Sequence, residues 1–328
     1  MNRLFEQAYF DEIKTLLLTY AFDNYDYCFL DEKWKLCHDT RPDVVMCGSS
    51  YMMDGFRDDV SEYNTVNLSI SSQDLYYIRE VLRRYISEIK KPDIFVFSGG
   101  RYILYHDLSM QSRESITIPR TLYRVYGVSH HKDKDLEFDP ARCFNTSYEI
   151  FREPEFLAFA DKWTRELIKE NGYRYYGTVM RADRDFADTW SGYSSWTDMP
   201  EEVKKAAAAK RTDSHNKLKK YIETFNENVG ILTDICRICV ENSIVPVLAM
   251  YPHSANYMEL IDSSYTEELM NVMEQIPYPL HYIDMNADCE LFTNDDFRDA
   301  DHLSEAGAFK ATALIDELLG EIYASGVS

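Results

Sequence analysis

Five short runs of β-branched and aromatic residues, alternating with longer helical patterns, are the feature that most restricts how this chain folds. The runs cover residues 44–47, 65–70, 94–97, 244–250 and 280–283. Apolar residues recur at helical spacing from Leu75 to Ile89, and Ser71 with Asp74 resembles the capping box of that helix. A last apolar stripe runs from Ala308 to Ile322. Strands alternating with helices predict a parallel sheet covered on both faces.

The segment between the third and fourth runs, residues 101–213, is too long for a plain connection. Helical patterns are expected at 154–169 and 201–220, the second as a solvated face. We expect residues 101–213 to form an inserted helical, aromatic-rich cap on an α/β domain made of residues 1–100 and 214–328. The alternative is that its aromatic residues form a satellite core. These residues are Trp163, Trp190, Trp196, Tyr173, Tyr175, Tyr176 and Tyr193.

The charge balance restricts the partners of the chain. Its 328 residues include 35 Lys and Arg against 56 Asp and Glu, a net charge of −21. This balance disfavours nucleic acid and anionic membrane surfaces, which bind concentrated positive charge. The N-terminal sequence reads as an amphipathic helix and not as a signal peptide, and no run of about 18 apolar residues is present. We expect a cytoplasmic protein without membrane insertion; the residues leave its oligomeric state open.

Neither the cysteines nor the paired histidines predict a cofactor or a metal. Seven scattered cysteines, an odd number, are typical of reduced thiols. Cys236 and Cys239 lie three residues apart in a helical pattern, which favours a buried face over a redox or metal pair. His130-His131 with Asp133 and Asp135 lacks ligand spacing, and neighbouring side chains do not all point inward.

Two segments place reactive side chains at the carboxyl edge of the predicted sheet. Gly48-Ser49-Ser50 follows the first strand, and Asp299 and His302 lie in a turn before the last helix. Open parallel sheets bind their ligands at this edge. Serine, histidine and aspartate are the parts of an acyl-transfer triad. Asp301 competes as the orienting acid, but the three-residue spacing favours Asp299.

These segments resemble the SGNH/GDSL hydrolase superfamily. The similarity rests on Gly48-Ser49-Ser50, on Asn-Leu-Ser-Ile-Ser-Ser at residues 67–72, and on Asp299-x-x-His302-Leu303 before a terminal helix. It is strongest to the branch with teichoic-acid D-alanyl-transfer and exopolysaccharide O-acetyltransferase-like proteins, and it covers residues 43–94 and 244–319. The resemblance implies a flavodoxin-like three-layer α/β/α sandwich, with Ser50 as nucleophile, His302 as base and Asp299 as acid.

The same resemblance implies an oxyanion hole with one departure from the family pattern. Backbone donors fall on Ser50 and on Ser72, with Ser71 as the competing position. The family's Gly-x-Asn is Gly99-Gly100-Arg101 here. Arg101 is therefore expected either to supply the missing donor or to hold an anionic group of the substrate, unless it is a surface arginine. His253, after the fourth strand, is expected to line the pocket or to be a satisfied loop histidine.

The predicted activity is that of a serine esterase or acyltransferase acting through an acyl-serine. Its substrate is expected to be a short acyl ester of a small molecule, carbohydrate or cell-envelope precursor. The residues do not distinguish water from a sugar hydroxyl as the acyl acceptor. The alternative is a catalytically idle carbohydrate- or partner-binding protein on the same fold, favoured by the missing asparagine.

Overall fold

A single five-stranded parallel sheet forms the centre of the molecule, as the sequence predicts. The computed structural model describes residues 2–144, 148–175, 195–288 and 290–326. Along the sheet the strands run in the order β2-β1-β3-β4-β5. Their bounds are β1 Val44–Gly48, β2 Thr65–Asn67, β3 Ile94–Ser98, β4 Val245–Met250 and β5 His281–Asp284. The chain is thus a mixed α/β protein whose layout is compatible with a three-layer architecture.

The strand order creates a ligand-binding position at the end of β1. The chain passes from β1 to β2 on one side and returns to β3 on the other, which is the switch point where doubly wound sheets bind ligands. Gly48 pairs with Ser98 across β1 and β3. A Cβ atom at Gly48 would lie 2.6 Å from the Ser98 carbonyl oxygen, so only glycine permits this approach. Ser50 follows directly at this switch point.

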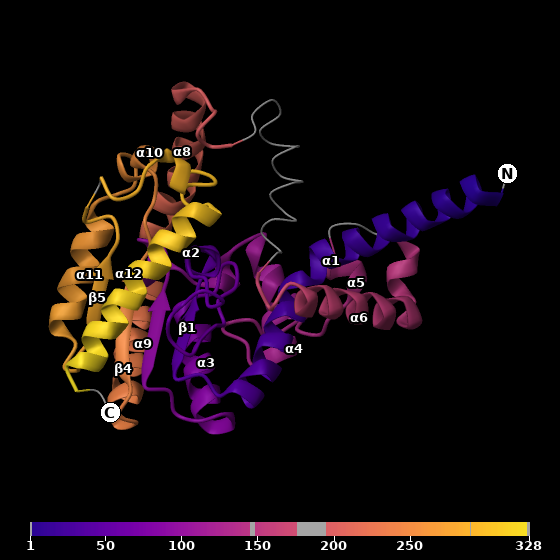
Figure 1. Ribbon diagram of the computed structural model, residues 1–328. Coiled ribbons are helices and arrows are strands. Elements are labelled where there is room, and N and C mark those ends of the chain that lie inside the picture. The colour runs from indigo at the N-terminus through magenta and orange to yellow at the C-terminus, as the bar shows by residue number, and fades with distance from the viewer. Residues whose placement is uncertain (1, 145–147, 176–194, 289, 327–328) are drawn as a thin grey trace.

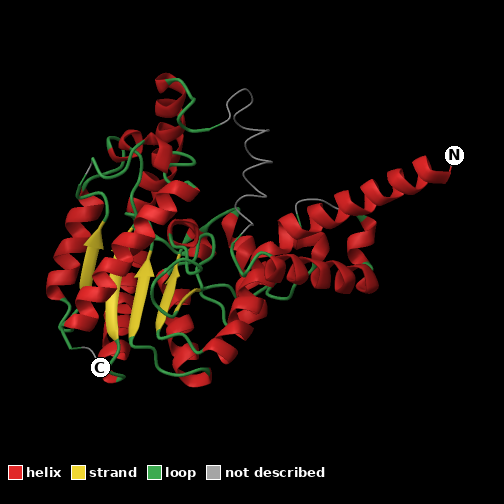
Figure 2. Cartoon of the chain, in the orientation of Figure 1, coloured by secondary structure: helices red, strands yellow, loops and turns green. Residues whose placement is uncertain are grey.

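Helices lie in front of the sheet and behind it (Figure 2). Helix α3, Leu75–Glu88, packs against α9, Ile222–Glu241, and α12, Glu305–Ala324, packs against α2, Ser50–Gly55. The N-terminal helix α1 covers Asn2–Thr40, and α11 covers Ser264–Gln275. The C-terminal part of α1 reaches the main core through Leu30, Trp34 and Cys37. Its earlier part extends away from the sheet (Figure 1).

The inserted segment divides between two places. Helix α6, Pro154–Glu170, lies along α1, whereas α8, Glu201–Asn216, packs against α10, Ala255–Met258 (Figure 1). The other short elements among the described residues are η1 Ile103–Tyr105, η2 Leu108–Met110, η3 Glu114–Ile116, η4 Ile118–Leu122, α4 Tyr123–Tyr126, α5 Pro140–Cys143, η5 Glu149–Arg152, η6 Lys217–Lys220 and η7 Asn294–Asp296. Only part of the insertion therefore reaches the carboxyl edge of the sheet.

The aromatic residues of the insertion pack mainly as core side chains. Trp196 is buried in the main core, and Trp163 packs against a small cluster around Tyr20 and Phe151. Tyr173 and Tyr175 pack against a second small cluster, which is formed by α1 and α6. The other aromatic positions named from the sequence, Tyr176, Trp190 and Tyr193, lie outside the described residues.

Local details differ from the sequence patterns at two helix boundaries. Asp74, and not Ser71, is the N-cap of α3, and its carboxylate accepts the Tyr77 N–H at 3.2 Å. Ser72 has a φ of +60°, which turns the chain just before this cap. Helix α8 ends at Asn216 and tightens into η6. Within the described ranges, every helix is too short or too polar to cross a lipid bilayer.

Candidate active site

Ser50, His302 and Asp299 meet at the carboxyl end of β1. The Ser50 Oγ lies 2.9 Å from Nε2 of His302, although the two residues are 252 positions apart. On the other side of the ring, Nδ1 lies 3.0 Å from both carboxylate oxygens of Asp299. A proton on Nδ1 is therefore held by the carboxylate, which leaves the Nε2 lone pair directed at the serine hydroxyl.

Hydrogen bonds to backbone groups hold the turn that carries His302. One Asp299 oxygen also accepts the backbone N–H groups of Asp301, at 3.0 Å, and of His302, at 2.8 Å. Ser254 donates both its N–H and its hydroxyl to the Ala300 carbonyl. The Asp-x-x-His spacing thus lets one carboxylate close the turn and contact the imidazole it precedes.

Asp301 has different partners from Asp299. It is buried, and it accepts the Tyr51 hydroxyl at 2.8 Å and Nε of Arg211 at 2.7 Å. Its nearest oxygen is 3.6 Å from Nδ1 of His302. Burial raises the pKa of Asp301, but Arg211 and the nearby histidines lower it more, so this carboxylate stays ionised. The two acids therefore pair with different cations.

The carboxylates set the protonation of the histidine. Burial lowers the pKa of His302, while Asp299 and Asp301 raise it more strongly, so the net pKa lies above the usual 6.5. Burial raises the pKa of Asp299, and the adjacent His302 lowers it below the ordinary value. The pair thus favours an ionised carboxylate beside an imidazole that accepts a proton readily.

A pocket of about 240 Å³ opens beside Ser50. The strand ends contribute Ser72, Gly99 and Gly100 to its wall. Two parts of the inserted segment form the facing wall, one around Arg113 and the other around Arg211. Its lining also includes Ser49, Gln73, Asp74, Tyr102, Ile103, His106, Gln111, Ser112, Glu114, Ser214, His215 and Leu218. The wall is thus mainly polar.

Two of the residues expected to supply the oxyanion hole, Ser50 and Ser72, line this pocket. Ser50 is the first residue of α2, where N–H groups have no partner within the helix. Ser72 lines the pocket, and its hydroxyl donates to Glu114 at 2.9 Å. Within the described part of the chain, no acceptor is found for the Ser72 backbone N–H. Ser71, the competing position, does not line the pocket.

Arg101 and His253 are not among the residues that line the pocket. Arg101 is buried, and its guanidinium donates to both oxygens of Asp284, at 2.5 and 2.6 Å, and to Asn286 at 2.9 Å. His253 is also buried, with its ring centroid 4.7 Å from that of Tyr51, and burial lowers its pKa to about 4. Neither side chain therefore forms part of the pocket wall beside Ser50.

Sequence reasoning missed the residues that occupy the facing wall. Arg211 and His215 lie on α8, which we expected to be a solvated face, yet both line the pocket. His215 is buried and lies 2.6 Å from the Tyr257 hydroxyl. The helix is rich in alanine and lysine, so its pattern carries no signal for one inward-facing side. Asp284 and Asn286, the partners of Arg101, were also missed.

Among the described residues, two groups of side chains have the composition of a metal site, and one of them contains the acid and base of the candidate triad. Asp299, Asp301 and His302 offer ligand atoms within 4.8 Å of one another. Both ring nitrogens of His302 already have partners, however. The other group consists of Asp107, His130 and His131.

The cysteines are buried, as far as the structure describes them. Cys236 and Cys239 lie on α9, where burial raises the pKa of the Cys236 thiol to about 12. Cys28, Cys37, Cys47 and Cys143 are free and buried too. Cys289 is outside the described residues. A pKa raised in this way makes the Cys236 thiol a poor metal ligand or nucleophile.

Known proteins give no independent assignment for this site. No protein-family model matches the chain, and no curated protein has significant sequence similarity to it.

Proposed function

We propose that this protein is a serine esterase or acyltransferase of the SGNH type, built on a flavodoxin-like three-layer sandwich. The observation that carries the proposal is the continuous contact from Ser50 Oγ to His302 Nε2 and from His302 Nδ1 to Asp299. A hydroxyl, an imidazole and a carboxylate in this order are the arrangement that activates a serine for acyl transfer.

The proposed reaction proceeds in two halves. His302 takes the Ser50 proton as Oγ attacks the acyl carbon, and then gives that proton to the departing alcohol. In the second half His302 deprotonates water or an acceptor hydroxyl, which attacks the acyl-serine and releases Ser50. Asp299 holds the imidazole orientation and stabilises its cation in both halves.

We assign the oxyanion hole to the backbone N–H groups of Ser50 and Ser72, with Gly100 as the third donor. All three residues line the pocket. One such donor lowers a barrier by about 2.7–4 kcal/mol in a comparable site. Arg101 is a positioning residue in this proposal, because its guanidinium joins the end of β3 to Asp284 at the end of β5.

The pocket favours a short acyl ester of a polar alcohol. Its volume of about 240 Å³ is below the range of about 300–1,000 Å³ typical of ligand sites, which limits the acyl group. Hydroxyl and charged side chains dominate its wall, and these suit a polyhydroxylated leaving group such as a sugar. Two parts of the inserted segment complete this wall. One contains Gln111 and its neighbours in sequence, and the other contains Arg211.

The test is labelling of the purified full chain with a fluorophosphonate probe, followed by peptide mapping. We expect one adduct, on Ser50, and none in Ser50→Ala. Ser69→Ala is the matched control, because the Ser69 hydroxyl is buried without a hydrogen-bond partner and does not line the pocket. A folded wild-type protein that stays unlabelled would overturn the proposal and favour a carbohydrate- or partner-binding role. An adduct on another residue would overturn the assignment of Ser50 as the nucleophile.

Hydrolysis and transfer differ in their response to an added acceptor. With p-nitrophenyl acetate, an esterase releases acetate whether or not a sugar is present. A transferase forms the acetylated sugar at the expense of acetate, while release of p-nitrophenol continues. Quantifying the two acetyl products decides between the two activities.

A further inference from the structure

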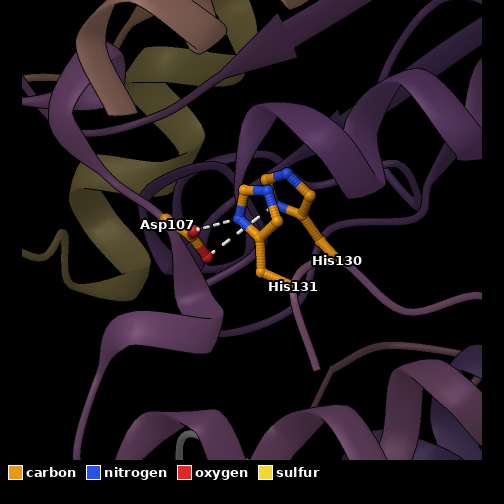
Figure 3. Close-up of side chains that lie close together, drawn as sticks. All are labelled: Asp107, His130 and His131. Atoms are coloured by element: carbon orange, nitrogen blue, oxygen red, sulfur yellow. Dashed lines mark hydrogen bonds and ion pairs between the residues drawn. The ribbon is translucent and has the colours of Figure 1, made fainter. Parts of the chain in front are cut away.

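A second histidine cluster, remote in sequence from the proposed triad, joins three segments of the chain. Asp107 precedes η2, His130 and His131 follow α4, and Glu227 lies on α9. The two imidazole rings lie face to face, with centroids 3.9 Å apart, and both are directed at Asp107 (Figure 3). His131 has a φ of +52°, which turns the chain so that consecutive histidines share one side. Asp133 and Asp135 are exposed and take no part.

One carboxylate, that of Glu227, lies beside the Nε2 atom of each ring. Glu227 Oε1 lies 3.1 Å from Nε2 of His130 and 3.5 Å from Nε2 of His131. The hydrogen bond of His130 to Glu227 places a proton on Nε2 of His130 and leaves its Nδ1 lone pair available. Nδ1 of His131 shares a proton with Asp107 at 2.9 Å, and a bound ion would replace that proton. A carboxylate on the far nitrogen is the usual support of a metal-binding histidine.

The two Nδ1 atoms face Asp107. The nearest oxygens of Asp107 lie 2.9 Å from Nδ1 of His131 and 3.7 Å from Nδ1 of His130. Two ligands of a tetrahedral ion at about 2.1 Å are separated by about 3.4 Å, which lies between these distances. All three ligand atoms lie within 4.8 Å of one another.

An unsatisfied atom points to a cation here. His130 is 5% exposed, and its Nδ1 has no hydrogen-bond partner among the described residues. A buried ring nitrogen without a partner is costly, and Asp107 at 3.7 Å is too distant to accept a proton from it. Tyr76 stacks on the other face of the His130 ring at 4.3 Å, so the ring is held in this orientation.

The surroundings favour positive charge. Asp74 lies 4.0 Å from Nδ1 of His130, and Asp107 is 3% exposed. Glu227 lies on the other side of both rings, next to their Nε2 atoms. Three carboxylates thus surround two rings that the proposed triad does not use.

We propose that Asp107, His130 and His131 form a binding site for a first-row divalent metal ion, with zinc as the best-suited ion. Two imidazoles and one carboxylate are a donor set that zinc prefers, and a fourth position remains for water. Asp74 lies close to His130, and His106 directly precedes Asp107 in the sequence. Both residues line the Ser50 pocket. The Leu108 N–H also donates to Asp74 at 2.8 Å. A bound ion would thus tie the wall of that pocket to α9.

The experiment is zinc titration of the chelator-stripped full chain by calorimetry, with cobalt(II) absorption as the coordination readout. We expect one equivalent of zinc to bind and cobalt to give visible bands of a low-symmetry site. His131→Asn removes one ligand at an exposed position and suits a positive φ, so the protein should still fold while affinity falls more than a hundredfold. Glu227→Gln should weaken binding about 10–100-fold.

His38→Asn is the matched control, because His38 is also exposed and lies near the end of α1. It should bind zinc like the wild type. Absence of stoichiometric binding to the wild-type chain would overturn the proposal. So would equal affinity in wild type, His131→Asn and Asp107→Asn, since the ion would then be held elsewhere. Circular dichroism of each variant shows whether a lost site reflects lost folding.

Discussion

The two histidine clusters use the same residue types and differ in where each ring nitrogen points. His302 has a hydroxyl on Nε2 and a carboxylate on Nδ1, so a proton can pass along one line. His130 and His131 have a carboxylate beyond each Nε2, and their Nδ1 atoms converge on Asp107. The arrangement around His302 therefore suits proton transfer, whereas the arrangement around His130 and His131 suits a shared cation.

The largest effects that test this contrast come from removing the hydroxyl or the imidazole of the first cluster. Ser50→Ala and His302→Ala should each lower kcat for p-nitrophenyl acetate by a factor on the order of 10⁴–10⁶, because triad members act as a unit. Zinc affinity should be unchanged in both variants. Steady-state kinetics and calorimetry on the same preparations measure this. If His131→Asn lost as much activity as His302→Ala, the two clusters would not have separate roles.

The second effect distinguishes the two acids of the Asp299–His302 turn. Asp299→Asn should lower kcat on the order of 10³–10⁴-fold, since the amide no longer holds the required tautomer. Asp301→Asn should lower kcat far less, because Asp301 pairs with Arg211 and Tyr51. It should instead lower stability by about 1–3 kcal/mol, as a charged hydrogen bond is lost. Denaturant unfolding of both variants provides the stability readout, and the reverse ranking in kcat would assign the acid to Asp301.

Sequence reasoning predicted those parts of the fold and the site that depend on local pattern. The runs of residues that became β1 to β5 are short and β-rich, and they stand out because helical spacing surrounds them. The proximity of Ser50, Asp299 and His302 follows from strand ends meeting at one edge of a parallel sheet. These features require no knowledge of side-chain packing.

The remaining features depend on contacts between distant segments. Arg101 follows a glycine turn in the sequence, but only the fold shows that Asp284 and Asn286 take its guanidinium. The sequence pattern predicts that His130 and His131 do not converge, because the positive φ at His131 is not visible in it. Their partner Asp107 is remote in sequence, and no spacing rule connects them.

The third effect concerns Arg101, whose buried charge is paired away from the pocket. Arg101→Met leaves the Asp284 carboxylate without its cation, and breaking a buried pair costs about 3–5 kcal/mol. Catalysis should change equally for neutral and anionic esters. Arg237→Met is the control: its guanidinium pairs with Asp234 and Glu241 on the surface of α9, and the melting temperature should stay unchanged. A selective rise in KM for anionic esters in Arg101→Met would instead show that Arg101 binds the anionic group of the substrate.

The smallest expected effect is a shift in the pH dependence of kcat/KM. This shift distinguishes the carboxylate of Asp301, near His302, from that of Glu227 in the other cluster. His302 accepts the Ser50 proton only when neutral, and its pKa lies above 6.5. Below that pKa, kcat/KM should fall about tenfold per pH unit as the imidazole becomes protonated. Asp301 raises this pKa, so Asp301→Asn should move the midpoint to lower pH. Glu227→Gln changes the other cluster and should leave the midpoint in place. A flat profile from acidic to neutral pH, or equal shifts in both variants, would contradict the role of His302 as the base.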